Sequence, residues 1–339
     1  MQKMPLVTGV TFASFQGLGI QVGLEVAETA RLMGYSSYWT AETLGQEAFA
    51  TLAAVGAKQP SLDLGTGVLA LQLRTPMLAA MGAATLQDIS PNAQVLLGVG
   101  ISSPVVVGRW HGAAYSDHPI AQVREYLQLT QACLSGEPVS HKGDYYHCNK
   151  FRLGVRLGDR RPKLVLGALN QRMLSLAGEL ADGVLLNYLP ASAVPWCIEQ
   201  VRAGERSAGR AVGSCKIYAY VHVAVCDREA ALPHARKDIY SYAVVPAYAR
   251  AFARAGFASE IEALQLALAE KNRDAAVAAI SDRMADAIDI CGSASTVAKA
   301  VQDYRDAGVE VPVIMPMPWG DDRLGVIHAT LRASLGQID

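Results

Sequence analysis

Short apolar runs alternate with amphipathic stretches along nearly the whole chain. The apolar runs predict buried strands, and apolar positions at helical spacing between them predict helices. The predicted strands cover residues 6–12, 36–40, 62–69, 94–99, 163–166, 184–187, 216–225 and 311–315. A strand that recurs after each helix is typical of parallel βα units.

Several helix boundaries carry residues with a known structural preference. Thr75 and Pro76 stand where an N-cap and a first helical turn are expected, and that helix runs to about residue 89. Gly34, Gly136 and Gly308 stand where three other helices are expected to end. Eight parallel strands with helices between them predict an α/β fold of the closed (β/α)8 barrel type, a TIM barrel, rather than an open sheet.

Two segments depart from this rhythm. Residues 139–161 contain a polar stretch from His141 to Tyr146 that is typical of a hairpin turn, so an insertion is predicted there. Residues 228–285 are alanine-rich and helical without a strand signal, which predicts a second insertion. Because no strong linker flanks the helical segment at either end, we expect one domain over residues 1–339.

The composition narrows the class of protein. Hydrophobic residues make up 51% of the chain and charged residues 18%, which suits strands buried on both faces. A net charge of −1 without a clustered basic run argues against nucleic-acid binding. No apolar run is long enough to span a membrane, and no signal peptide is recognisable, so a cytoplasmic protein without membrane contact is expected.

Several kinds of site have no support in the residue spacing. The six cysteines form no Cys-x-x-Cys pair, which favours reduced, mostly buried thiols. The seven histidines show no metal-ligand spacing, so no metal site is predicted. A Gly-x-Ser-x-Gly elbow is absent, and Gly98-Val99-Gly100 lacks the full spacing of a Rossmann dinucleotide site.

The strongest candidates lie where strands end, because a (β/α)8 barrel builds its sites at the C-terminal ends of its strands. Residues 98–103 and 167–170 are glycine-bearing loops that lead toward a helix. Glycine lets a backbone approach a ligand closely, and a helix N-terminus offers free N–H groups to an anion. Both loops therefore predict contact with a phosphate-bearing cofactor, although tight turns without a ligand also explain them.

Glu42 is the carboxylate placed directly after the second predicted strand, close in sequence to Trp39. At that place it would accept hydrogen bonds from a ring N–H or take part in proton transfer. A solvated loop glutamate is the alternative.

Taken together, the strand ends resemble the bacterial luciferase-like superfamily, (β/α)8 barrels that use FMN or the deazaflavin coenzyme F420. The segments 39–42 and 109–112 look most like the F420-dependent branch. The segments that carry the resemblance are residues 64–68 (LGTGV), 74–76 (RTP), 97–100 (LGVG), 109–112 (RWHG) and 177–183 (AGELADG).

The resemblance implies a specific site. A non-prolyl cis peptide that backs the deazaflavin ring would fall at Gly67–Val68, Glu42 would be the polar group nearest the ring, and a homodimer or higher homo-oligomer is expected. The cofactor phosphate and tail would lie along residues 98–103 and 167–170. The full set implied to contact the cofactor is Thr11, Phe12, Glu42, Gly67, Val68, Gly98, Gly100, Ile101, Ser102, Ser103, Gly167, Ala168, Leu169 and Asn170, with Glu42 also as the catalytic candidate.

The chain departs from its relatives at two positions. Several F420 enzymes carry an Asp-His pair after the second strand, where this chain has Glu42-Thr43, so the histidine is absent. The glucose-6-phosphate branch has a glutamate where Ser103 stands, which argues against sugar-phosphate oxidation by that mechanism. His111 belongs to a shared segment and has a structural alternative.

The leading hypothesis is an F420-dependent oxidoreductase that transfers a hydride between the deazaflavin and a small organic substrate. An FMN-dependent luciferase-like monooxygenase is the first alternative, and a non-catalytic protein that binds F420 or flavin is the second. At the sixth and seventh strand ends, Asn187, Tyr188 and His222 are candidates for the substrate pocket, with ordinary loop or strand residues as the alternative.

Overall fold

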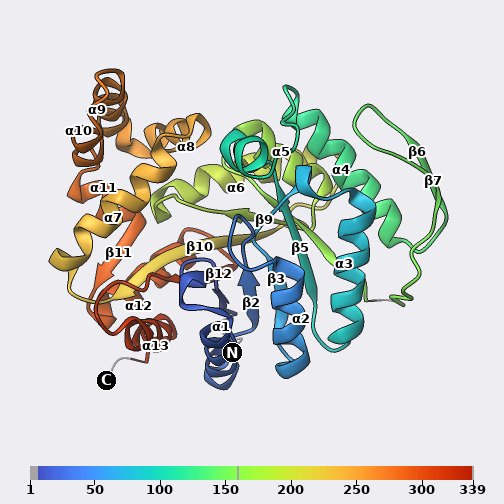
Figure 1. Cartoon of the computed structure of the whole chain (residues 1–339), viewed down its shortest axis with the longest axis horizontal. Helices are drawn as coiled ribbons and strands as arrows, with labels where there is room; N and C mark the ends of the chain where they lie inside the picture. Colours follow the sequence, from blue (N-terminus) through green and yellow to red (C-terminus); the bar gives the residue numbers. More distant parts are fainter. Residues whose placement is uncertain (1–6, 159, 338–339) are drawn as a thin grey trace.

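The computed structural model describes residues 7–158 and 160–337, so the first residue of the strand predicted at 6–12 lies outside it. In these residues eight parallel strands close into a barrel (Figure 1). The strands, in spatial order, are β1 (Gly9–Thr11), β2 (Ser37–Thr40), β3 (Asp63–Thr66), β5 (Val95–Gly100), β8 (Lys163–Gly167), β9 (Gly183–Leu186), β10 (Lys216–Val225) and β12 (Val311–Pro316).

The ring closes because β10 pairs with both β9 and β12, and β12 pairs in turn with β1. All of these pairs are parallel, as the alternation of strands and helices predicts. The predicted (β/α)8 barrel is confirmed. The third predicted strand differs, since it divides into β3 and a short β4 (Leu69–Ala70) on either side of Gly67 and Val68.

A helix follows each barrel strand and buries an apolar face against the barrel. In α3 (Pro76–Ile89) the predicted start is confirmed: the Thr75 hydroxyl accepts from Leu78 N at 3.2 Å, and Pro76 occupies the first turn. The other barrel helices are α1 (Ile20–Met33), α2 (Ala48–Lys58), α4 (Pro119–Leu134), α5 (Gln171–Leu180), α6 (Val194–Ser207), α12 (Ala294–Asp306) and α13 (Arg323–Ser334).

The first predicted insertion contains the expected hairpin. Strands β6 (Val139–Lys142) and β7 (His147–Phe151) pair antiparallel, with Lys142 opposite His147. Glu125 of α4 accepts backbone N–H groups from Tyr145 and Tyr146 in the turn, so the hairpin is tied to the barrel wall.

The second insertion is helical, as predicted, and slightly longer than the expected 228–285. Its apolar side chains form a core of their own that includes Ile239, Phe252, Leu264 and Met284. The segment comprises α7 (Arg228–Ala243), α8 (Pro246–Phe252), the π-helix η5 (Ala253–Phe257), α9 (Ala258–Ala269), α10 (Arg273–Ala278) and α11 (Asp282–Ile288).

One strand was not predicted. β11 (Asp289–Gly292) follows α11 and pairs in parallel with the end of β10, with Asp289 opposite His222. Its four residues begin with a buried carboxylate, so the stretch carries no apolar run from which a strand is predicted. β11 nevertheless matters for the site, because its pairing with β10 brings Asp289 next to His222 at the barrel mouth.

The insertions lie on opposite sides of the barrel (Figure 1). The helices α7 to α11 gather beside β10 and β11, whereas the β6–β7 hairpin lies beyond α4. Within the described residues, no helix combines the length and the apolar character needed to cross a membrane.

The inward-facing side chains of β10 lead from the barrel interior to its mouth. Tyr218 and Tyr220 belong to the apolar cluster that fills the barrel, whereas the alternate residues Ala219 and Val221 pack in the core shared with the helices. Successive strand side chains point to opposite faces, so His222 follows Tyr220 on the inner face, toward the C-terminal end.

A buried carboxylate holds the loop that leads into β10. Glu205, on α6, is fully buried, and its Oε1 accepts from Cys215 N at 2.7 Å and from Arg202 Nη1 at 2.7 Å. Its Oε2 accepts from Gly213 N at 2.8 Å. The carboxylate thus fixes where β10, and everything that it carries, enters the barrel.

We expect Glu205→Gln to lower the free energy of unfolding by about 3 kcal/mol, because the amide NH2 would face a backbone donor and the ion pair would be lost. Urea unfolding measures the change. Glu199→Gln, an exposed substitution on the same helix, should stay within about 0.5 kcal/mol. Equal stabilities for the two variants would show that the Glu205 contacts do not hold the loop.

Candidate active site

The peptide bond between Gly67 and Val68 is cis, as the family resemblance implies. It lies between β3 and β4 at the mouth of the barrel. The Gly67 carbonyl accepts from the Tyr220 hydroxyl at 2.9 Å, and that hydroxyl accepts from Thr11 Oγ1 at 3.3 Å. On the other side, Gly67 N donates to the Thr40 carbonyl at 2.8 Å. Strands β1, β2 and β10 therefore all fix this segment.

Three glycines surround the Val68 side chain. A Cβ on Gly100 would lie 2.8 Å from Val68 Cγ2, and a Cβ on Gly167 would lie 3.3 Å from the same side chain. A Cβ on Gly98 would lie 1.9 Å from the Thr66 carbonyl oxygen. These glycines were predicted from the approach of a ligand, but the structure shows that their missing Cβ atoms make room for β3 and Val68. Val68 itself stays half-buried, and its side chain forms an apolar surface at the barrel mouth, called the floor below.

The two loops predicted to hold an anion differ in what they offer. After β5, Ser102 has a left-handed φ of 51° and an exposed side chain, while Ser103 Oγ accepts from Val106 N at 3.2 Å. The carbonyl of Ile101 accepts from the Gln72 side chain at 3.0 Å. Ser102 is therefore the exposed residue of this loop, and its carbonyl accepts from the Tyr115 hydroxyl at 3.5 Å.

After β8, Asn170 is the N-cap of α5, and its side chain makes no capping hydrogen bond. The first N–H groups of α5 are therefore left without a side-chain acceptor. Ala168 differs, because it is buried and its N–H donates to the Leu185 carbonyl at 3.3 Å. The Leu169 carbonyl accepts from Arg254 of the helical segment at 2.8 Å. Contact of these residues with an anion stays a prediction.

At the end of β1 the two predicted residues face different ways. Thr11 lies inside the barrel, within hydrogen-bond distance of Tyr220. Phe12 is fully buried on the helix side, where its ring packs beside Phe15 and against Gly23 of α1. The Phe12 ring is therefore a core side chain, and only its backbone lies at the strand end.

Glu42 is engaged by neighbouring groups. Its two oxygens accept from Arg74 at 2.6 and 3.1 Å, and Oε2 also accepts from Ala48 N at 3.1 Å. The pair is mostly buried, with 12% of the Glu42 side chain exposed. Nearby, His111 Nε2 donates to the Thr43 carbonyl at 2.6 Å, which agrees with its structural alternative. In this structure Glu42 orders the loop after β2, and its catalytic role stays a prediction.

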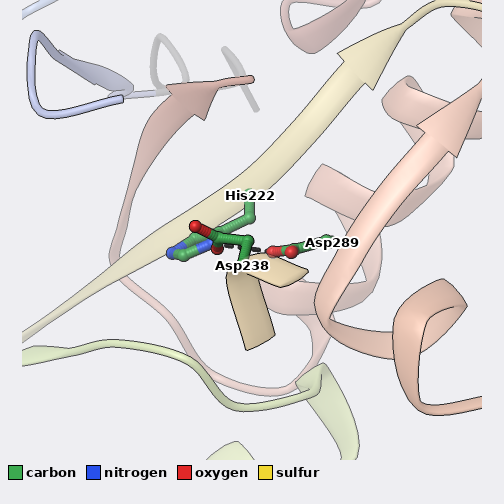
Figure 2. A group of neighbouring side chains, drawn as sticks. All are labelled: His222, Asp238 and Asp289. Carbon is green, nitrogen blue, oxygen red and sulfur yellow. Dashed lines mark hydrogen bonds and ion pairs between the residues drawn. The ribbon is translucent and has the colours of Figure 1, made fainter. Parts of the chain in front are cut away.

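A buried polar cluster lies at the end of β9, the C-terminal part of β10 and the start of β11. His222 from β10, Asp238 from α7 and Asp289 from β11 point toward one another (Figure 2). His222 Nδ1 lies 2.9 Å from Asp289 Oδ1, and Nε2 lies 2.8 Å from Asn187 Oδ1. The Tyr188 hydroxyl donates to Asp238 Oδ2 at 2.7 Å. One atom from each of the three residues in Figure 2 lies within 4.8 Å of the other two.

Burial decides the charges in this cluster. It raises the pKa of the Asp289 carboxyl well above its usual range. Burial, and then the neighbouring Asp289, raise the pKa of Asp238 to about 7. Burial lowers the pKa of His222 to about 4, so near neutral pH the imidazole is uncharged. Near neutral pH the imidazole is therefore neutral, the Asp289 carboxyl favours its protonated form, and Asp238 is close to its midpoint.

Comparison with known proteins places the chain in a family. The model of the family described as luciferase-like monooxygenase matches residues 11–310. The chain belongs to the luciferase-like monooxygenase family. It is thus an oxidoreductase of the luciferase-like type.

Two curated relatives match over most of their length. A putative coenzyme F420-dependent oxidoreductase of Mycobacterium tuberculosis is 28% identical, with 88% of this chain and 94% of the relative covered. The 5,10-methylenetetrahydromethanopterin reductase of Methanolobus tindarius is 24% identical, with 88% and 92% covered.

Solved structures share the fold. The coenzyme F420-dependent tetrahydromethanopterin reductase from Methanopyrus kandleri superposes with a TM-score of 0.79 at 20% identity, covering 97% of this chain and 98% of that one. An F420-dependent secondary alcohol dehydrogenase, in complex with an F420-acetone adduct, has a TM-score of 0.75 at 16% identity, with 99% and 100% covered.

Sequence reasoning found part of the polar cluster and missed its acids. Asn187, Tyr188 and His222 were recognisable because they stand at strand ends. Asp238 lies in α7, whose sequence gives no sign that this residue is directed toward a site. Asp289 lies on the strand that was not predicted. The only available signal for Asp289 was a lone acid between two apolar residues, Ile288 and Ile290, which is too weak to assign a site.

Tyr220→Phe should lower the free energy of unfolding by about 1–3 kcal/mol, because the buried Gly67 carbonyl loses its donor. Chemical denaturation measures this. Tyr218→Phe, on the same face of the same strand, is the matched control, since its hydroxyl has no hydrogen-bond partner in the described chain. Equal effects at both positions would refute the role assigned to the Tyr220 hydrogen bond.

The cluster also predicts a pH dependence of stability. The pKa of Asp238 is raised from 3.8 to about 7, so the stability that its neutral form contributes is present below 3.8 and lost as the pH rises through about 7. Wild type should therefore lose stability relative to Asp238→Asn between pH about 4 and about 7. Thermal melts across this range measure the difference. Asp303→Asn, which removes an exposed partner of Lys299, should run parallel to wild type. Parallel curves for wild type and Asp238→Asn would contradict the assignment.

Proposed function

We propose that the protein is a coenzyme F420-dependent oxidoreductase, which transfers a hydride between the deazaflavin and a small organic substrate. The relatives named for F420 support this, because they match over most of both lengths. The observation that carries it in the structure is the half-buried Val68 floor, framed by Gly98, Gly100 and Gly167 at the barrel mouth.

The residues at the mouth fit such a group. A flat, largely apolar ring needs an apolar surface to lie on, which Val68 offers, and its phosphate needs N–H donors, which the start of α5 and the backbone around Ser102 offer. When bound, the deazaflavin would supply or accept the hydride at its C5. The protein's own part is to orient the ring, exclude water and handle the proton.

The test is a comparison of the two cofactors. Purified protein is titrated with F420 and separately with FMN, and quenching of protein fluorescence reports binding. We expect saturable binding of F420 and at least tenfold weaker binding of FMN, a difference of about 1.4 kcal/mol or more.

Matched variants locate the site. Val68→Asp places a charge in the apolar floor and should weaken F420 binding at least tenfold, about 1.4 kcal/mol. Val212→Asp introduces the same charge at an exposed position and should bind like wild type.

Tight binding of FMN without binding of F420 would refute the proposal and favour a flavin monooxygenase. Equal F420 affinity in the two variants would show that the cofactor does not bind against Val68.

A further inference from the structure

We infer that Asp238 is the general acid of the active site, a carboxylic acid that protonates the oxygen or nitrogen of a carbonyl or imine substrate as its carbon receives the hydride. This inference rests on the proposed function. It supplies a proton donor for a chain that has Thr43 at the position where several F420 enzymes carry a histidine. Glu42, the catalytic candidate from the sequence, is less suited to this role, because both of its oxygens accept hydrogen bonds from Arg74.

The cluster stands above the predicted cofactor floor. Tyr220 holds the Gly67 carbonyl next to Val68, and His222 is the next inward-facing residue of β10 toward the mouth. Two residues of a strand advance by about 6.6 Å. The cluster is therefore one side-chain layer beyond the floor, where a substrate resting on the ring would lie. Asp238 reaches it from α7, on the side of the helical segment (Figure 2).

Of the two acids, Asp238 is the less buried. His222 and Asp289 are buried, with 1% and 2% of their surfaces exposed, whereas Asp238 is half-buried. Asn187 beside His222 is also half-buried. A small substrate at the mouth therefore meets Asp238 first, and His222 and Asp289 support it from behind.

The hydrogen-bond pattern places one proton between His222 and Asp289, and the lowered pKa of His222 assigns that proton to the carboxyl. Asn187 Oδ1 accepts from Tyr188 N at 2.9 Å, so this atom is the amide oxygen and His222 Nε2 must donate to it. In the uncharged imidazole, Nδ1 is then a bare acceptor facing Asp289 Oδ1 at 2.9 Å. Two acceptors at this distance need a proton between them, and the carboxyl of Asp289 is its source.

The surroundings of Asp238 favour a second proton in the cluster, on the Asp238 carboxyl. No lysine or arginine forms an ion pair with Asp238 or Asp289 in the described ranges, and Asp289 Oδ2 has no hydrogen-bond partner there. With no cation beside them, burial disfavours the charged form of each carboxyl, so Asp238 also tends to keep its proton. The groups that face Asp238 are Tyr188 after β9, His222 on β10, Tyr242 on α7 and Asp289 on β11. None of them carries a positive charge near neutral pH.

These features suit an acid that works near pH 7. A general acid is most effective when its pKa is close to the working pH, and the pKa of Asp238 is raised to about 7. In the reaction, the carbon of the C=O or C=N bond gains the hydride and is reduced. The π-electron pair moves to the heteroatom, which takes the proton from Asp238, and solvent protonates the resulting carboxylate. In the oxidative direction the same carboxylate accepts the proton.

The first experiment needs no cofactor. Infrared spectra of the purified protein in D2O record the C=O stretch of protonated carboxyl groups as the pH rises. Wild type and Asp303→Asn should show a component that disappears with a midpoint near pH 7, and Asp238→Asn should lack it. If Asp238→Asn does not fold, Asp238→Glu should shift the midpoint instead. A spectrum unchanged by both substitutions would overturn the inference.

Metal content is measured on the same samples. Two carboxylates and an imidazole at this spacing also suit a divalent metal ion. One equivalent of metal in wild type that is absent from Asp238→Asn would overturn the inference, because the cation between the groups would then not be a proton. We expect no metal above background in either sample.

The second experiment follows the reaction. Reduced F420 is mixed with cyclohexanone, cyclohex-2-enone and 1-pyrroline in a stopped-flow instrument, and the fastest acceptor is used. Asp238→Asn should lower the hydride-transfer rate about 100-fold, with F420 affinity unchanged and without the wild-type loss of rate above pH about 7. Asp303→Asn should match wild type.

The outcomes separate the two proposals. Failure of wild type to bind F420 contradicts the proposed function. F420 binding without reduction of any of the three probes contradicts the substrate class inferred for Asp238. An undiminished rate in Asp238→Asn, with F420 bound, contradicts the role of Asp238 alone.

Discussion

The hydrogen bond from the Tyr220 hydroxyl to the Gly67 carbonyl joins the two halves of the candidate site. It crosses the barrel from β10 to the end of β3 and so sets the position of Val68. Placement of Gly67 requires the absence of a side chain, because a Cβ there would lie 1.9 Å from the Tyr220 oxygen. The same strand that anchors the floor carries His222 one layer higher. Floor and polar cluster are therefore held in one geometry by β10.

This arrangement separates two tasks. The side of the mouth formed by β3, β5 and β8 is apolar and glycine-lined, with open N–H groups at the start of α5, and it suits a flat ring with a phosphate tail. The side formed by β9, β10 and β11 is polar and holds the hydrogen-bonded groups of His222, Asp238 and Asp289. The helical segment completes the second side, because α7 contributes Asp238 and its tyrosines pack on Tyr188. Redox chemistry would then belong to one side and proton chemistry to the other.

The barrel was predictable because its strands are continuous apolar runs, and a strand such as residues 216–225 has the same bounds in the sequence and in the structure. The hairpin was predictable from its turn residues. The glycines at 98, 100 and 167 were predicted from the close approach of a ligand, whereas the structure shows that they make room for β3 and Val68. The sequence does not reveal which neighbour occupies the space of a missing Cβ. Asp238 and Asp289 were out of reach, because Asp238 lies 50 residues beyond Tyr188 along the chain, past α6 and β10, inside the helical insertion. Only the pairing of β11 with β10 brings Asp289 to His222.

The most direct test of this account is a crystal structure of the protein soaked with F420. The account predicts the deazaflavin ring against Val68, its phosphate at the start of α5 or beside Ser102, and the Asp238 carboxyl on the open face of the ring. A ring bound elsewhere on the barrel, or one whose open face is turned away from Asp238, would contradict it.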